Sequence, residues 1–182
     1  AVCRHFGAAE RSGLAELLEG APEHALAWPE LDYHGPGATD HYYGPLIGIE
    51  AHDRPDWPHG AGPRTLVYLP FDRPASIVVA HALGGLRWPV LWHSSSPPPP
   101  GLPGNIRYCD KPIDLMAIGR QAALYVGRGG YGASASMLRA GTPQLLLPDR
   151  LESLLLTYRL CRAGVARSQA ASAGVQAVGE GL

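Results

Sequence analysis

The sequence predicts an α/β fold in which a doubly wound parallel sheet follows a shorter N-terminal segment. From residue 65 onward, short β-rich apolar runs alternate with helical patterns, which is typical of a parallel sheet. Before residue 65 the chain is dense in Gly, Pro, His and Asp and has no steady apolar period. A glycine-rich turn joins one predicted strand to the next helix. With 182 residues, the chain is long enough for one such domain and an attached segment.

The regular part of the chain is expected to hold five strands. They are predicted at 65–71, 89–93, 105–109, 123–126 and 144–147. Helical patterns are found at 75–86, 113–121, 134–139 and 151–162, the last closed by Gly164. Residues 94–104 (SSSPPPPGLPG) cannot form either element, because proline lacks the amide that a ladder needs. A polyproline-like surface loop is expected there.

The first 64 residues are interpreted as a separate unit. Residues 11–21 carry leucines at the spacing of a short amphipathic helix, and residues 25–33 indicate a strand that enters a loop. Residues 53–64 are rich in Pro and Gly, as interdomain linkers are. The chain begins without Met and ends without a clear helix cap, so we interpret it as a fragment. The expected division is 1–52 as the end of a first domain, 53–64 as linker and 65–182 as the α/β domain, truncated at its end.

Composition and charge exclude several classes of protein. Hydrophobic residues make up 46% and charged residues 17%, a globular composition, and the net charge of −1 gives no reason to expect nucleic-acid binding. No apolar run approaches the roughly 20 residues that a transmembrane helix needs. The three cysteines are far apart, and the histidines lack metal-ligand spacing. We therefore expect no metal site and no disulfide, and reduced thiols in a cytoplasmic protein.

Gly127-Arg128-Gly129-Gly130-Tyr131-Gly132 is the most informative stretch for function. It follows a predicted buried strand and opens a predicted helix. Glycines let the backbone approach a ligand closely, and the helix start directs free amides at an anion. Arg128 adds a planar cation suited to phosphate. The alternative is a tight turn whose glycines serve packing alone.

The position of this loop favours a ligand site. In open parallel sheets, ligands bind beyond the carboxyl ends of the strands, where this loop lies. Glu152 opens the helix after the next strand, at the same edge. It is either a ligand contact or an acid favoured there by the helix dipole.

The stretch from residue 123 onward, ALYVGRGGYGASASMLRAGTPQLLLPDRLESLLLTYRLCRAGVA, resembles the second domain of GT-B glycosyltransferases of the UDP-glycosyltransferase and family 28 type. The matching residues, at matching spacing, are Gly129, Gly130, Gly132, Ala140-Gly141-Thr142-Pro143, Pro148, Glu152, Arg159-Leu160 and Gly164-Val165. Upstream, Pro112 resembles the proline before the base-binding turn, and Trp57 the tryptophan at the end of the linker. The resemblance covers about residues 25 to 167.

The resemblance implies a Rossmann-like, nucleotide-sugar-binding C-terminal domain and transfer of a sugar from a nucleoside-diphosphate sugar, UDP or dTDP being expected. The diphosphate would rest on residues 129–134 beside Arg128, the base against residues 111–113, and the sugar against Glu152 and Ser153. The implied donor-binding residues are Arg128, Gly129, Gly130, Gly132, Ser134, Glu152, Ser153, Pro112 and Ile113. No further cofactor and no metal is implied. The acceptor, a small molecule or a lipid, and the general base would belong to the first domain, in a cytoplasmic or membrane-peripheral protein.

The sequence departs from the family pattern at several positions. Arg128 replaces the usual histidine, Ala133 a threonine, Ser136 a glutamate and Ser153 a glutamine. The first strand ends in Leu-Pro-Phe-Asp instead of Gly-Ser. Two alternatives therefore stay open: a non-catalytic relative with a degraded donor site, and a UDP-sugar epimerase of the same architecture.

Overall fold

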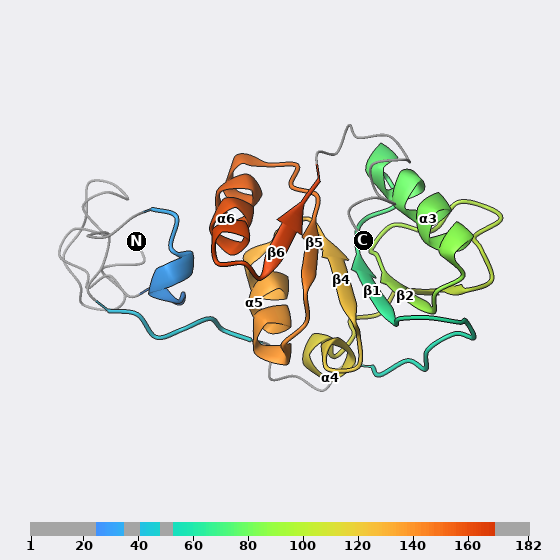
Figure 1. Ribbon diagram of the computed structural model, residues 1–182, viewed down its shortest axis with the longest axis horizontal. Coiled ribbons are helices and arrows are strands. Elements are labelled where there is room, and N and C mark those ends of the chain that lie inside the picture. The colour runs from blue at the N-terminus through green and yellow to red at the C-terminus, as the bar shows by residue number, and fades with distance from the viewer. Residues whose placement is uncertain (1–24, 35–40, 48–52, 170–182) are drawn as a thin grey trace, which may run out of the picture.

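A six-stranded, all-parallel sheet forms the centre of the protein (Figure 1). The computed structural model describes residues 25–34, 41–47 and 53–169. The strand order is β3-β2-β1-β4-β5-β6, so the direction of winding reverses between β1 and β4. The strands are β1 (Thr65–Tyr68), β2 (Val90–His93), β3 (Ile106–Cys109), β4 (Leu124–Gly127), β5 (Gln144–Leu146) and β6 (Ala166–Ser168). The predicted doubly wound α/β fold is confirmed.

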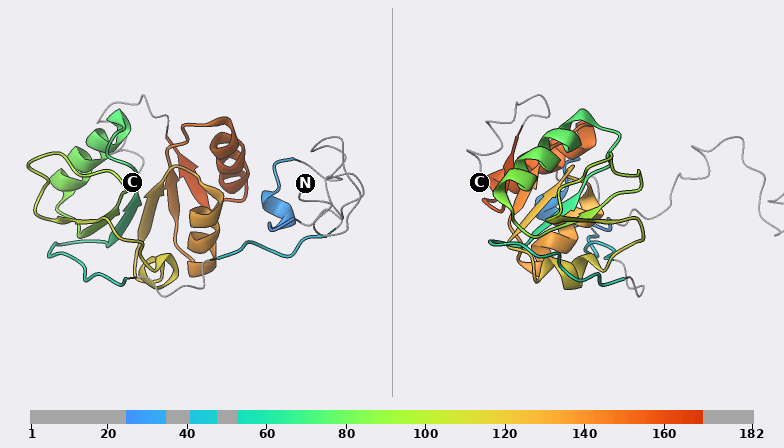
Figure 2. Two further views of the ribbon diagram at one scale, coloured as in Figure 1. Left: turned by 180° about the vertical axis from the view of Figure 1, so that it is seen from behind. Right: turned by 90° about the vertical axis from the view of Figure 1, so that its right-hand side faces the viewer.

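Helices cover both faces of this sheet (Figure 2). Helix α3 (Pro74–Leu86) packs on one face, in a cluster with Val67, Trp92 and Val126. The other face is covered by α4 (Leu115–Gly119), α5 (Tyr131–Ala140) and α6 (Leu151–Arg162). Each of these helices leads from the carboxyl end of one strand toward the next strand, so the loops that precede them gather at one edge.

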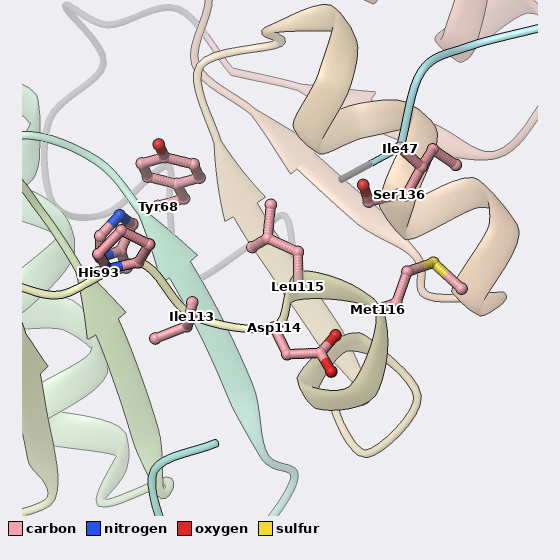
Figure 3. A pocket seen from close by; sticks show the side chains of 9 residues that line it. Ile47, Tyr68, His93, Ile113, Asp114, Leu115, Met116 and Ser136 are labelled. Atoms are coloured by element: carbon pink, nitrogen blue, oxygen red, sulfur yellow. The ribbon is translucent and has the colours of Figure 1, made fainter. Parts of the chain in front are cut away.

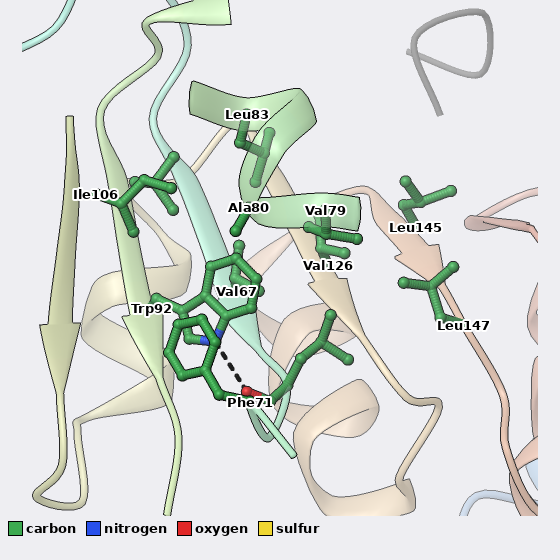
Figure 4. Packing of buried hydrophobic residues seen from close by; sticks show 12 residues of the cluster. Val67, Phe71, Val79, Ala80, Leu83, Trp92, Ile106, Val126, Leu145 and Leu147 are labelled. Atoms are coloured by element: carbon green, nitrogen blue, oxygen red, sulfur yellow. Dashed lines mark hydrogen bonds between the residues drawn. The ribbon is translucent and has the colours of Figure 1, made fainter. Parts of the chain in front are cut away.

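Successive side chains of each strand point to opposite faces of the sheet, so the hydrophobic core has two halves, one on each face. In β1, Leu66 and Val67 are both fully buried but belong to opposite faces, as the period of two requires. Trp92 anchors the α3 side: its ring stacks on Phe71 at 4.5 Å, and its Nε1 donates to the Leu69 carbonyl over 2.8 Å (Figure 4). These contacts hold the loop that leaves β1.

Several boundaries differ from the sequence prediction. Helix α5 begins at Tyr131, three residues earlier than predicted, while α4 is shorter than the predicted 113–121. The strand β6 was not predicted, because only Ala166 of its three residues is buried. Residues 94–104 form the predicted loop without helix or strand. The Ala-rich end of the chain after residue 169 lies outside the described residues.

The strand predicted at 25–33 is wrong. Ala25 makes only an isolated bridge with Tyr42, and a 3-10 helix, η1 (Pro29–Leu31), follows. Pro29 has no amide for a ladder and suits the first position of a helical turn. The helix expected at 11–21 lies outside the described residues.

The described segment before β1 touches the sheet domain at several places, among them α4 and the start of α5. Asp53 pairs with Ile113, and Trp57 Nε1 donates to Gln121 Oε1 over 3.0 Å, so residues 53–57 run beside α4. Near η1, the Trp28 amide donates to the Tyr131 hydroxyl over 2.9 Å. Among the described residues, none of the helices is both long and apolar enough to cross a membrane.

Candidate functional site

The glycine-rich loop connects β4 directly to α5. Gly129 has φ of +75°, a conformation that favours glycine, and a β-carbon there would lie 2.5 Å from Thr157 Oγ1. Gly130, with φ of −72°, caps the helix, and nothing lies within 4 Å of where its β-carbon would be. The first glycine is therefore needed for packing against α6, whereas the second leaves open space at the start of α5.

Free backbone amides lie at this helix start. The Ser134 amide already donates to the Gly130 carbonyl over 3.0 Å, so the first helical bond closes there. The amides of Tyr131, Gly132 and Ala133 precede it and have no helical acceptor. Together with the helix dipole they form an environment that stabilises an anion.

The structure places Ser134 inside α5. Because α5 begins at Tyr131, Ser134 lies in the body of the helix and is fully buried. Its hydroxyl has no hydrogen-bond partner among the described residues and does not line the pockets described below. The expected contact between this hydroxyl and a ligand is therefore not supported.

Arg128 is held in an ion pair that the sequence did not predict. Its Nε lies 3.4 Å from Asp149 Oδ1, and Arg73 approaches the other oxygen of the same carboxylate at 4.0 Å. The Arg128 side chain is 31% exposed and that of Asp149 is 20% exposed. The positive charge of Arg128 at the glycine loop is thus partly neutralised by Asp149.

Three neighbouring pockets lie along the carboxyl edge of the sheet. The Pro70 pocket, about 370 Å³, lies between the ends of β1 and β2 and the start of α5, with Tyr68, Ser94, Arg128 and Gly132 in its wall. The Glu152 pocket, about 90 Å³, lies between the glycine loop and α6. The His93 pocket, about 170 Å³, lies beside α4. Tyr68 lines both the His93 and Pro70 pockets, whereas Arg128, Gly130 and Tyr131 line both the Pro70 and Glu152 pockets.

The His93 pocket contains the residues expected near a nucleotide base. Pro112 and Ile113 line it, and Ser136 of α5 lies opposite the rings of Tyr68 and His93 (Figure 3). These two rings are 4.6 Å apart, and His93 Nδ1 lies 3.0 Å from the Cys109 carbonyl oxygen. The pocket thus combines an aromatic wall with apolar residues and with the polar groups of Asp114 and Ser136.

The Glu152 pocket contains five of the expected donor-binding residues. They are Arg128, Gly129, Gly130, Glu152 and Ser153. Glu152 is exposed in the first turn of α6 and lines this pocket together with Tyr33. Burial first, and then the interaction with Glu152, raise the pKa of the Tyr33 phenol. The Ser153 hydroxyl donates to the Arg150 carbonyl over 2.9 Å, so its proton is used in capping α6.

The structure brings together eight of the nine expected donor-binding residues along one edge, Ser134 being the exception. The sequence reasoning missed Tyr33, Tyr68 and His93, whereas Tyr131 lies inside the glycine-rich stretch and Asp149 and Arg150 belong to the segment 149–153 that follows the next predicted strand. Tyr68 and His93 stand at strand ends, so the rule that located the glycine loop could have found them. Among the described residues, no group of three or more His, Cys, Asp or Glu side chains could hold a metal ion.

Solved structures of glycosyltransferases resemble this chain. The glycosyltransferase of kitacinnamycin matches with a TM-score of 0.69 at 21% identity, over 87% of this chain and 45% of its own. SnogD from Streptomyces nogalater matches with a TM-score of 0.67 at 16% identity, over 93% of this chain and 48% of its own. VinC, solved in complex with dTDP, matches with a TM-score of 0.54 at 20% identity, over 76% of this chain and 36% of its own.

The chain spans less than half the length of these solved structures. No protein-family model and no curated protein matches it. The parallel sheet, its strand order and these similarities agree on the architecture. The chain therefore has the Rossmann-like α/β fold of the C-terminal domain of GT-B glycosyltransferases.

Proposed function

We propose that this chain is the donor-binding half of a glycosyltransferase that uses a nucleoside-diphosphate sugar. The observation that carries the proposal is the start of α5, where free amides and Arg128 adjoin the Pro70 and Glu152 pockets. An anion between these pockets would meet both the helix dipole and a guanidinium. The dTDP bound by VinC supports a ligand of this class.

The three pockets suit the parts of such a ligand. The base would enter the His93 pocket beside Pro112 and Ile113, and the diphosphate would lie against Gly130 and Gly132. The sugar would then reach Glu152. Because Tyr68 and Arg128 each line two of the pockets, one ligand can extend through all three. UDP and dTDP are the proposed nucleotides, with no further cofactor.

The chemistry of this half is stabilisation of the leaving group. In transfer, the bond between the anomeric carbon and the diphosphate oxygen breaks, and an acceptor oxygen forms a new bond to that carbon while losing a proton to a base. Negative charge grows on the departing diphosphate, where the amides and Arg128 would stabilise it. The acceptor, a small molecule or a lipid, and the base would be held by a first domain.

The two described cysteines, Cys109 and Cys161, are free thiols, which supports a cytoplasmic location.

Calorimetry with UDP, dTDP, GDP and ADP on the full chain tests the proposal. We expect selective binding of one nucleoside diphosphate, weakened about tenfold or more by Arg128→Ala. The control Arg120→Ala removes an exposed arginine that lines none of the three pockets, and should leave the affinity unchanged. Absence of binding to all four ligands, or equal loss in both variants, would refute the proposed site.

A non-catalytic nucleotide-binding relative is the second candidate. It is favoured by Ser136 and Ser153, whose hydroxyls donate to backbone carbonyls and not into the pockets. The two candidate functions differ in whether Glu152 contributes to binding the donor sugar. A working donor site predicts that Glu152→Gln weakens binding of UDP-glucose or dTDP-glucose but not of the free diphosphate. A degraded site predicts no effect on either ligand.

A further inference from the structure

Asp149 links three loops at the carboxyl edge of the sheet. It follows β5, pairs with Arg128 after β4, and is approached by Arg73 from the loop between β1 and α3. These strands are neighbours in the order β1-β4-β5, and the carboxylate reaches the proposed donor site through Arg128, which lines both the Pro70 and Glu152 pockets. Among the described residues, it is the acid that forms an ion pair with Arg128, the cation that would bind the diphosphate.

The ion pairs of Asp149 are loose enough to coexist with a ligand. Its carboxylate lies 3.4 Å from Arg128 Nε and 4.0 Å from Arg73 Nη2. Both distances exceed the usual length of a charge-assisted hydrogen bond, about 2.7–2.9 Å. Arg128 can therefore turn toward a phosphate without moving far from Asp149. The carboxylate would then repel that phosphate, and at 20% exposure this repulsion is only partly screened by water.

Repulsion by a fixed charge grows with the charge of the ligand. A nucleoside-diphosphate sugar carries about two negative charges on its phosphates. The free nucleoside diphosphate carries about three at pH 8, because a terminal phosphate loses its second proton near pH 6. A carboxylate beside the phosphates therefore disfavours the free diphosphate more than the sugar-linked form.

We propose that Asp149 is a specificity-determining residue that makes this site discriminate between the donor and the diphosphate product. It disfavours the more highly charged nucleoside diphosphate and so promotes its release after transfer. This inference rests on the proposed function. It assigns to Asp149 a role separate from that of Arg128, which binds both ligands.

The test compares two ligands in two variants. Dissociation constants for UDP and UDP-glucose, or for dTDP and dTDP-glucose if those bind better, are measured at pH 8 and low salt. In Asp149→Asn, the ratio of the constant for the free diphosphate to that for the sugar nucleotide should fall roughly three- to tenfold, as expected for one charge pair several ångströms apart near the surface. Because Arg128 also acts more strongly on the more highly charged ligand, the ratio is compared between Arg128→Ala and Arg128→Ala/Asp149→Asn as well, where the same fall isolates the effect of Asp149.

Asp72→Asn is the matched control. Asp72 contacts Arg73 at 3.7 Å but is 65% exposed, so its charge is screened and the ratio should stay unchanged. The shift in Asp149→Asn should also shrink in 1 M salt, where the screening length is about 3 Å.

Other outcomes separate this inference from the proposed function. Binding of both ligands with an unchanged or increased ratio in Asp149→Asn would overturn the role of Asp149 and leave the donor site standing. A wild-type chain that binds neither ligand would overturn both. Dissociation rates provide a second readout: the free diphosphate should leave Asp149→Asn more slowly than it leaves the wild type.

Discussion

The hydroxyl of Tyr125 lies against the α-carbon of Gly127 on the same face of β4. The two residues are two positions apart in the strand, so their side chains point to the same side of the sheet. Tyr125 is 1% exposed, and burial raises the pKa of its phenol well above the ordinary range. A β-carbon on Gly127 would overlap the Tyr125 hydroxyl and ring. The last residue of the strand therefore has to be glycine before the glycine-rich loop even begins.

Gly127→Ala should destabilise the protein. The added methyl group must displace a buried tyrosine, which costs about 1–3 kcal/mol. Urea unfolding followed by circular dichroism measures the loss. Gly85→Ala provides the matched comparison, because Gly85 lies in α3 with nothing within 4 Å of its β-carbon position. That change should stabilise by about 0.5–1 kcal/mol, and equal effects of the two substitutions would contradict the packing described for Gly127.

Gly129 and Gly130 should respond differently to alanine. Gly129→Ala is strained by its positive φ and by contact with Thr157, so we expect lower stability and loss of nucleoside-diphosphate binding. Gly130→Ala has an ordinary φ and open space, so the fold should keep its stability. Thermal melting and calorimetry on both variants check this. A Gly129→Ala protein with wild-type melting temperature and affinity would show that the loop tolerates other conformations.

The fold was predictable because its signals are local and repeated. Short apolar runs recur along the chain, and a longer helical pattern follows most of them, as after β1. Each such strand and helix together give further support for a parallel α/β sheet. Boundaries were less predictable where the residues at an end also suit another conformation. Tyr131 and Gly132 read as loop, yet α5 begins there because Gly130 provides an extended cap.

The candidate site was predictable where a local motif or a position after a strand end marks it, as for the glycine loop, Pro112 and Glu152. Gly129, Gly130 and Arg128 fell where expected, because the turn between β4 and α5 is local in sequence. The pairing of Arg128 with Asp149 joins residues 21 positions apart and depends on the order of the strands. The contact of Tyr33 with Glu152 depends on how the N-terminal segment lies on α6. Such contacts follow from the tertiary structure, and no local sequence pattern predicts them.

Asp114 should make the stability of α4 depend on pH. Its carboxylate accepts from the Ala117 amide over 2.9 Å and pairs with Arg54 at 2.7 Å. The amide contact first, and then Arg54, hold the pKa of Asp114 below its ordinary value of 3.8. This stabilisation is therefore present above pH 3.8 and is lost as the pH falls through the lower pKa of the folded protein.

Asp114→Ala should cost about 1 kcal/mol of unfolding free energy at pH 7, as expected for a lost helix cap. The difference from the wild type should narrow as the pH is lowered below 3.8, where the wild-type carboxyl group also becomes neutral. Denaturant unfolding at several pH values measures both quantities. Asp72→Ala, at an exposed acid, should show neither effect. A difference that stays constant down to pH 2 would contradict the electrostatic origin of the cap.

Two buried threonines should respond in opposite ways to replacement by valine. Thr157, 1% exposed, has a hydroxyl without a hydrogen-bond partner among the described residues. Thr157→Val removes an unpaired polar group at nearly constant shape and should stabilise the protein by up to about 1–2 kcal/mol. Thr142, 4% exposed, donates to the Gly119 carbonyl over 2.8 Å, so Thr142→Val should destabilise by about 1 kcal/mol. Urea unfolding measures the unfolding free energy of the two variants. If Thr157→Val is less stable than the wild type, the Thr157 hydroxyl has a partner, such as a buried water molecule beneath the glycine loop.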